Sequence, residues 1–135
     1  MSEPRPAIFD ELLAGPYPCC LTTLDGAGNP YSVVVWCGSF GDMVAVNATE
    51  SVWLKNLHRD PRASVLIVDT ANILRYVSIR GRVADVTPDR DYAHINSLSE
   101  VYEGRPYAYS TPEDVPRYRV AITVDKLRTT DIATA

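Results

Sequence analysis

The arrangement of short apolar segments constrains the fold of this chain more than any other feature of its sequence. Val33-Val34-Val35 is continuously apolar, and residues 63–68 (Ala-Ser-Val-Leu-Ile-Val) alternate little between apolar and polar side chains. A strand with one face in water alternates strictly, whereas a strand without alternation is buried on both faces. In a chain of 135 residues, this pattern favours a closed barrel or a second subunit packed against the outer face of the sheet.

The composition bounds the class of protein. Hydrophobic residues make up 46% of the chain and charged residues 22%, which is typical of one globular domain, so we predict a single domain spanning residues 1–135. No run approaches the ~18 apolar residues of a membrane span, and the first residues lack the basic-then-apolar order of a signal peptide. We therefore expect a cytoplasmic protein without a membrane partner.

Charge and metal-ligand patterns argue against two further classes. The 13 basic and 17 acidic residues give a net charge of -4 without any basic cluster, so we predict no nucleic-acid partner. Cys19, Cys20 and Cys37 are an odd number with two neighbours, which predicts reduced thiols buried in strands. His58 and His94 lie far apart without CxxC or HxxxH spacing, so we predict no metal site and interpret both histidines as surface residues.

Turn and helix signals divide the chain into six strands and three helices. Apolar residues at helical spacing predict an opening helix over residues 7–13, which ends at Gly15-Pro16. The expected strands cover residues 19–24, 31–36, 43–47, 63–68, 76–86 and 119–124, with turns at residues 25–30 and 38–42. Gly81, in the middle of the fifth strand, indicates the bulge or tight bend of a barrel corner.

The last helix is expected between the fifth and sixth strands. Thr87 as its cap and Pro88 in its first turn predict a helix that runs to Tyr102. Its expected core face carries Tyr92, Ile95, Leu98 and Val101. The order of elements predicts a mainly β fold with α, namely a six-stranded, mostly antiparallel barrel with flanking helices.

Residues 47–62 join a predicted strand to a short helix and are the first candidate for a functional site. Thr49 or Ser51 can cap this helix, and Pro61 prevents its continuation. Hydroxyl groups, free backbone N–H groups and Lys55 one turn into the helix are features of a phosphate site at a helix start. The alternative is a helical connector whose lysine is simply solvated.

Four segments, by their order and spacing, carry a resemblance to a known family. They are residues 21–36 (LTTLDGAGNPYSVVVW), 56–64 (NLHRDPRAS), 76–83 (YVSIRGRV) and 98–107 (LSEVYEGRPY), followed by Arg119-Val120. Together they resemble the split β-barrel flavin and deazaflavin oxidoreductases related to pyridoxamine 5′-phosphate oxidase. The resemblance implies an FMN-binding-like split β-barrel that forms a homodimer, with two sites for FMN or F420 at the subunit interface.

The resemblance also implies roles for particular residues, each of which packing or solvation would explain equally well. Against the cofactor ring it places Ser32, Val33 and Val34. Along the ring edge and ribityl chain it places Asn47, Ala48 and Thr49, and near the phosphate Ser51 and Lys55. From the partner subunit it brings Arg75 and Tyr76. Near the substrate we place Trp53, Arg105, Tyr107 and Tyr109.

The phosphate-binding pattern departs from the family at two positions. Family members commonly carry basic residues where this chain has Ser51 and Trp53. Lys55 lies roughly 200° around the helix from Trp53, so it cannot point in the same direction. Because a charge-assisted contact to phosphate is stronger than a neutral one, the departure predicts weaker cofactor binding. Trp53 could instead stack on a ring or fill the space.

Three functions are compatible with this sequence. The first is a reductase in which bound F420 or FMN passes a hydride to a small organic substrate, with no catalytic acid or nucleophile assigned. The second is a binding protein, similar to pyridoxamine 5′-phosphate oxidase, that holds another planar ligand against Trp53. The third is a cofactor-free enzyme that uses tyrosine or histidine as acid and base.

Overall fold

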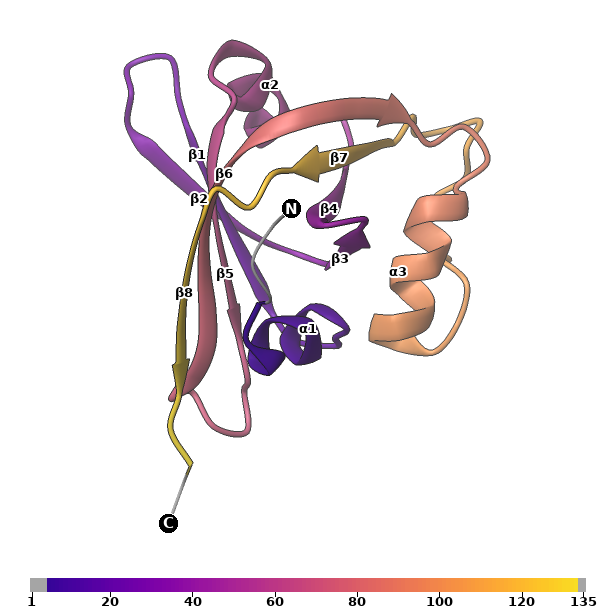
Figure 1. Cartoon of the computed structure of the whole chain (residues 1–135). Coiled ribbons are helices and arrows are strands. Elements are labelled where there is room, and N and C mark those ends of the chain that lie inside the picture. Colours follow the sequence, from indigo (N-terminus) through magenta and orange to yellow (C-terminus); the bar gives the residue numbers. More distant parts are fainter. Residues whose placement is uncertain (1–4, 134–135) are drawn as a thin grey trace.

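The computed structural model describes residues 5–133, within which the chain forms eight strands and three helices (Figure 1). The strands are β1 (Cys19–Leu24), β2 (Pro30–Val35), β3 (Cys37–Phe40), β4 (Met43–Ala48), β5 (Arg62–Val68), β6 (Arg75–Pro88), β7 (Tyr118–Ile122) and β8 (Lys126–Asp131). The helices are α1 (Ala7–Leu13), α2 (Val52–Arg59) and α3 (Ala93–Glu103). No helix in this described part of the chain is long and apolar enough to cross a membrane.

The strands pair antiparallel, and one long strand joins the two halves of the sheet. The strand order is β2-β1-β5-β6-β7-β4-β3, and β8 also pairs with β6. The first half of β6 pairs with β5 and β8, whereas its last residues, from Val83 to Pro88, pair with β7. In Figure 1, β6 bends away from β5 and β8 to run along β7. This antiparallel arrangement with flanking helices confirms the predicted split β-barrel.

Gly81 lies close to the point where β6 changes partners. A Cβ atom at this position would lie 1.7 Å from the carbonyl oxygen of Thr123, so only glycine lets the two backbone segments approach this closely. The irregular pairing itself lies further along the strand, between Val83 and Asp85. The predicted corner is therefore present, with its bulge beyond Gly81.

The interior of the barrel is filled by apolar side chains from alternate strand positions, as the two-residue period of a strand requires. The strand residues without any exposed surface include Leu21, Val44, Val46, Val65, Ile67, Val77, Ile79, Val120 and Ile122. Helices α1 and α2 add Phe9, Leu12, Leu54 and Leu57 to the same core. The two short helices therefore serve as covers for the barrel.

The outer face of β2, β1 and β5 carries exposed apolar side chains within one chain. Val34 is 76% exposed and Leu66 is 39% exposed, although the continuous apolar runs predicted burial on both faces. Closure of the barrel does not cover these side chains. Of the two explanations for the apolar runs, a second subunit is the one that we propose for this face.

Two strands and one helix boundary differ from the prediction. The strand β3 overlaps residues 38–42, which were predicted as a turn, and the polar strand β8 was missed entirely. The helix predicted to start at Thr87 starts later, because Thr87 and Pro88 continue β6 opposite β7. The Asp89 carboxylate then accepts hydrogen bonds from the backbone N–H groups of His94 and Ile95 at 3.0 and 2.9 Å, near the start of α3.

One residue of the predicted core face of α3 was assigned wrongly. Tyr92, Ile95 and Leu98 are buried, whereas Val101 is 44% exposed. Figure 1 shows α3 standing beside β3 and β4, away from β5 and β8. The helix therefore buries one face of its first two turns and leaves part of its last turn in solvent.

Candidate functional site

Helix α2 begins and ends as the sequence predicted. The Ser51 hydroxyl accepts a hydrogen bond from the backbone N–H of Leu54 at 3.4 Å, which identifies Ser51, and not Thr49, as the cap. The helix ends before Pro61. In this cap the Ser51 hydroxyl is an acceptor, so its O–H group is still free to donate a hydrogen bond.

The two α2 residues on which the phosphate prediction depends point in different directions. Trp53 is only 8% exposed, whereas Lys55 is exposed. An α-helix turns about 100° at each residue, so two positions two residues apart lie on nearly opposite sides. Helix α2 therefore presents an indole, and not a cation, to the interior.

A cavity of about 400 Å³ lies between β2, β4, α2, α3 and the loop at residues 104–117. Six predicted site residues line it: Val34, Asn47, Thr49, Trp53, Tyr107 and Tyr109. It is also lined by Val35, Trp36, Ile95, Leu98 and Arg117, to which the sequence assigned no site role. The fold thus gathers most of the predicted ring-edge and substrate residues at one place.

Contacts between aromatic rings form one wall of the cavity and join the loop at residues 104–117 to α3 and to Trp36. Trp36 stacks on Tyr102 of α3, with ring centres 5.4 Å apart and an angle of 15° between the planes. The ring of Tyr107 meets Trp36, Tyr92 and Tyr109 edge to face, at 6.3, 5.9 and 5.3 Å. Such walls offer flat, apolar surfaces, which suit a planar ligand.

Asn47 is the centre of a buried polar network at one wall of the cavity. Its Nδ2 donates to Asp89 Oδ2 and also contacts His94 Nδ1, each at 3.0 Å. Its Oδ1 accepts a hydrogen bond from Arg117 Nη1 at 3.0 Å. Arg117 Nη2 in turn donates to the Tyr107 hydroxyl at 2.6 Å. Both ends of the Asn47 amide are therefore fixed, and the guanidinium is held at the cavity.

His94 is half-buried, so the prediction of a surface histidine was wrong. Because Asn47 Nδ2 donates, Nδ1 of His94 must accept, which assigns the imidazole proton to Nε2. Burial lowers the pKa of His94; the charge of Asp89 acts in the opposite direction, and that of Arg119 lowers it further. His94 is therefore a neutral acceptor that orients Asn47.

The other predicted site residues do not line the cavity. They are Ser32, Val33, Ala48, Ser51, Lys55, Arg75, Tyr76 and Arg105. The Ser32 hydroxyl lies 2.8 Å from that of Thr22 on the neighbouring strand, and Val33 and Ala48 pack against the core. Arg105 is exposed, with its guanidinium 5.7 Å from the centre of the Tyr109 ring. Cofactor contacts of these residues across a dimer interface stay predictions.

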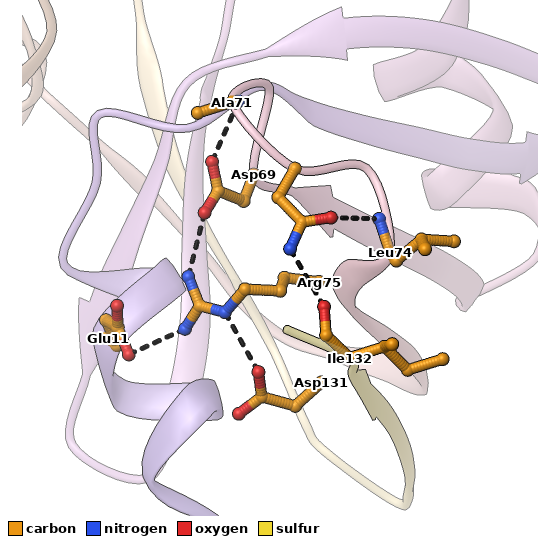
Figure 2. Close-up of polar contacts among 8 residues, drawn as sticks. Glu11, Asp69, Ala71, Leu74, Arg75, Asp131 and Ile132 are labelled. Carbon is orange, nitrogen blue, oxygen red and sulfur yellow. Dashed lines mark hydrogen bonds and ion pairs between the residues drawn. The ribbon is translucent and has the colours of Figure 1, made fainter. Parts of the chain in front are cut away.

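Arg75 has a clear role within its own chain (Figure 2). Its Nη1 donates to Asp69 at 2.8 Å, its Nη2 to Glu11 at 2.9 Å and its Nε to Asp131 at 2.9 Å. The three carboxylates come from α1, the loop after β5 and the end of β8. Arg75 therefore ties three segments together, and any contact that it makes with a cofactor would compete with these ion pairs.

Sequence reasoning missed Arg117, Asp89 and the part that Trp36 plays in the cavity. Arg117 and Asn47 are 70 residues apart, so no local spacing links them. The available signal was weak, namely an arginine two residues before the last predicted strand and close to an aromatic loop. Trp36 belonged to a segment that carried the family resemblance, but without an assigned role.

Comparisons with known proteins agree with this fold. The family model described as pyridoxamine 5′-phosphate oxidase matches residues 6–131. A solved structure named F420 Reductase is 23% identical, with a TM-score of 0.82, and the match covers 92% of this chain and 98% of that one.

Two further solved structures share the fold at low identity. A conserved hypothetical protein from Mycobacterium tuberculosis is 24% identical, with a TM-score of 0.74 over 97% of this chain and 85% of its own. General Stress Protein 26 from Bacillus anthracis is 17% identical, with a TM-score of 0.70 over 93% of both chains. Among curated protein sequences, none matches this chain.

Proposed function

Because this chain belongs to the pyridoxamine 5′-phosphate oxidase family, we propose that it is a reductase that uses F420 or FMN and acts on a small organic substrate. The observation that carries this proposal is the cavity between α2, α3 and β4, with its aromatic walls and few polar groups. The similarity to a structure named F420 Reductase makes F420 the first cofactor to test. The bound cofactor would supply the hydride chemistry.

The cavity fits the ring of such a cofactor better than it fits the phosphate. Its volume of about 400 Å³ lies within the roughly 300–1,000 Å³ of small-molecule sites. Trp36 and Trp53 supply flat walls, and the Asn47 amide and the Thr49 hydroxyl supply polar contacts. Lys55, the cation expected at the phosphate, is exposed and lies outside the cavity lining.

In this proposal the chain binds, orients and shields the reacting molecules. Trp53 packs against a ring, the remaining lone pair of Asn47 Oδ1 accepts a hydrogen bond from the ring edge, and α3 with the loop at residues 104–117 limits the access of water. Within the described residues, no acidic side chain and no thiol lines the cavity. This lining is consistent with chemistry that the cofactor carries.

We further propose that the protein is a homodimer whose two sites lie at the subunit interface. The open apolar face that carries Val34 and Leu66 supports this proposal, because contiguous exposed apolar surface usually marks an interface. Val34 also lines the cavity. A partner on this face would therefore complete one side of the site.

A second candidate function is the binding of another planar ligand without F420 or FMN. The observation that favours it is Trp53, which fills a place where family members commonly carry a basic residue.

Calorimetric titration with F420 and, separately, with FMN tests the proposed function. We expect one of the two to bind with a micromolar dissociation constant, after which its reduced form would be used to screen small acceptors. Binding of neither would reject the reductase and favour the second candidate. Sedimentation of the same samples tests the dimer, and a monomer that binds cofactor would reject the interface site.

A further inference from the structure

Arg117 is the charged residue of the cavity, and its guanidinium contacts only neutral partners. Within the described residues, Nη1 donates to the Asn47 amide oxygen and Nη2 to the Tyr107 hydroxyl. Its Nε is buried and has no hydrogen-bond partner there. The guanidinium also lies 4.6 Å from the centre of the Tyr107 ring and 5.9 Å from that of Tyr92.

Three other arginines of the chain differ from Arg117, because carboxylates balance their charge. Arg62 pairs with Asp60, Arg75 with three acids and Arg119 with Asp85. In residues 5–133, Arg117 forms no such ion pair.

The carboxylate of Asp89, which belongs to the same network, already accepts hydrogen bonds from donors other than Arg117. Its carboxylate accepts hydrogen bonds from two backbone N–H groups of α3 and from the Asn47 amide. A partly buried cation without a counter-ion is costly, and an anion in the cavity would relieve this cost.

The position of Arg117 is fixed before any ligand arrives. Asp89 and His94 orient the Asn47 amide that accepts from Nη1. The backbone N–H of Tyr107 donates to the side chain of Asn96 at 2.9 Å, which anchors the loop to α3. A guanidinium held in this way loses little freedom when it binds a planar anionic group.

We propose that the cavity binds a planar organic anion, with its rings beside Trp36 and Trp53 and its carboxylate or phosphate on Arg117. This inference deepens the proposed function, on which it rests for the view that the ligand is a substrate or a cofactor. A small aromatic acid and the phosphate of a cofactor share this chemistry. The aromatic walls bind the rings, and Arg117 selects the charged form over a neutral isostere.

The competing explanation is that Arg117 only fastens the loop at residues 104–117 to β4. An arginine with only this structural role would stabilise the fold, but it would not make the cavity bind an anionic ligand more tightly than a neutral ligand of the same shape. The preference for charge is therefore the quantity to measure.

The experiment compares two pairs of ligands by calorimetry at fixed salt. The first pair is 2-naphthoate and 2-naphthamide, and the second is FMN and riboflavin, which lacks the phosphate. We expect at least one anion to bind roughly 10-fold to 100-fold more tightly than its neutral counterpart. This comparison in the wild-type protein needs no variant.

Variants then assign the preference to one residue. Arg117→Gln should abolish the preference for the anion while leaving the neutral ligand's affinity unchanged, and Arg117→Lys should restore part of it. Arg62→Gln removes an exposed arginine elsewhere on the chain and should leave the preference intact. Circular dichroism melting of each variant checks that it is folded.

The two ligand pairs distinguish the sources of the anion. A loss of preference in the naphthoate pair assigns Arg117 to a small aromatic acid, and a loss in the FMN pair assigns it to the cofactor phosphate. Equal affinity within both pairs, or no binding of any anion, would overturn the inference. So would an equal weakening of anion and amide in Arg117→Gln.

Failure of the inference and failure of the proposed function give different results. If naphthoate is preferred over naphthamide but neither F420 nor FMN binds, the anion site stands and the reductase is rejected. If F420 or FMN binds without dependence on Arg117 and neither ligand pair shows a preference, the reductase stands and the anion site is rejected.

Discussion

Replacing Gly81 with alanine tests whether the close approach of β6 to Thr123 organises the split barrel. The added Cβ would lie 1.7 Å from the carbonyl oxygen of Thr123 and 2.8 Å from its carbonyl carbon. Both are backbone atoms, so no rotation of a side chain relieves the clash. Ordinary contact begins at 3.4 Å, so the backbone would have to move by about 1.7 Å.

A movement of this size would break hydrogen bonds at the corner of the barrel. The backbone N–H of Thr123 donates to the Arg82 carbonyl at 2.9 Å, and the N–H of Arg82 donates to the Thr123 hydroxyl at 3.0 Å. Each contributes about 1 kcal/mol, and overpacking adds about 1–3 kcal/mol. We therefore expect Gly81→Ala to lower the free energy of unfolding by about 3–5 kcal/mol, a large part of the roughly 5–15 kcal/mol of a typical domain.

Urea unfolding followed by circular dichroism measures this loss. Gly26→Ala is the matched control, because the atoms nearest to its added Cβ, at 3.3 Å, belong to the flexible side chain of Arg59. The control should stay within about 0.5 kcal/mol of the wild type. A Gly81→Ala protein within about 1 kcal/mol of the wild type, with an unchanged denaturant slope, would refute the reasoning.

Three further changes test the site and its supports. Arg75→Ala removes the cation that joins α1 to β8, so we expect a lower melting temperature and a smaller difference at high salt; an unchanged melting temperature would show that the ion pairs contribute nothing. Burial lowers the pKa of His94 from its ordinary value of 6.5. As the pH falls through 6.5, His94 therefore takes up a proton in the unfolded chain before it does so in the folded protein. The free energy of unfolding decreases from this pH down to the pKa of His94 in the folded protein. Urea unfolding across this range should show a smaller loss in His94→Gln than in the wild type or in His58→Gln, and equal losses would contradict the assignment. Trp53→Lys removes one aromatic wall and places a cation on α2, so calorimetry should show that the affinity for FMN relative to riboflavin, which lacks the phosphate, rises about tenfold; an unchanged ratio would separate α2 from the phosphate.

The local sequence pattern was sufficient to predict the elements whose side chains fill the core. The apolar run in β5 and the capped start of α2 could be predicted because burial and capping act on neighbouring residues. The turn after β1 is equally local, since the Asp25 carboxylate accepts hydrogen bonds from the N–H groups of Ala27 and Asn29. In these segments, the residues that determine the structure are within a few positions of one another.

The missed elements depend on partners that are distant in the sequence. The strand β8 is polar and exists because its backbone pairs with β6. The strand β3 contains Gly38 and Ser39, which are typical of a turn, yet it pairs along β4. Helix α3 is capped by the Asp89 carboxylate, which reaches N–H groups five and six residues further on, outside the usual capping spacing.

The same distinction applies to the site. Asn47, Thr49 and Trp53 were found because they lie in or just before one short helix, and Tyr107 and Tyr109 because they share one aromatic loop. The pairing of Asn47 with Arg117 depends on the antiparallel register of β4 and β7, which sets Asn47 opposite Arg119. That register could not be read from either strand alone, so the cation of the cavity was missed.

Trp53 and Arg117 line the same cavity, and their combined substitution tests whether they serve one anionic group or two. If a cofactor phosphate lies at α2 and another anion lies at Arg117, the effects of Trp53→Lys and Arg117→Gln on the affinity for FMN relative to riboflavin should add within about 0.5 kcal/mol in the double variant. If Arg117 binds the phosphate that Trp53 displaces from α2, Trp53→Lys should compensate for Arg117→Gln, and the two effects should not add. Additive effects would therefore favour two anion subsites, and a coupling above about 0.5 kcal/mol would favour one phosphate position shared by the two residues.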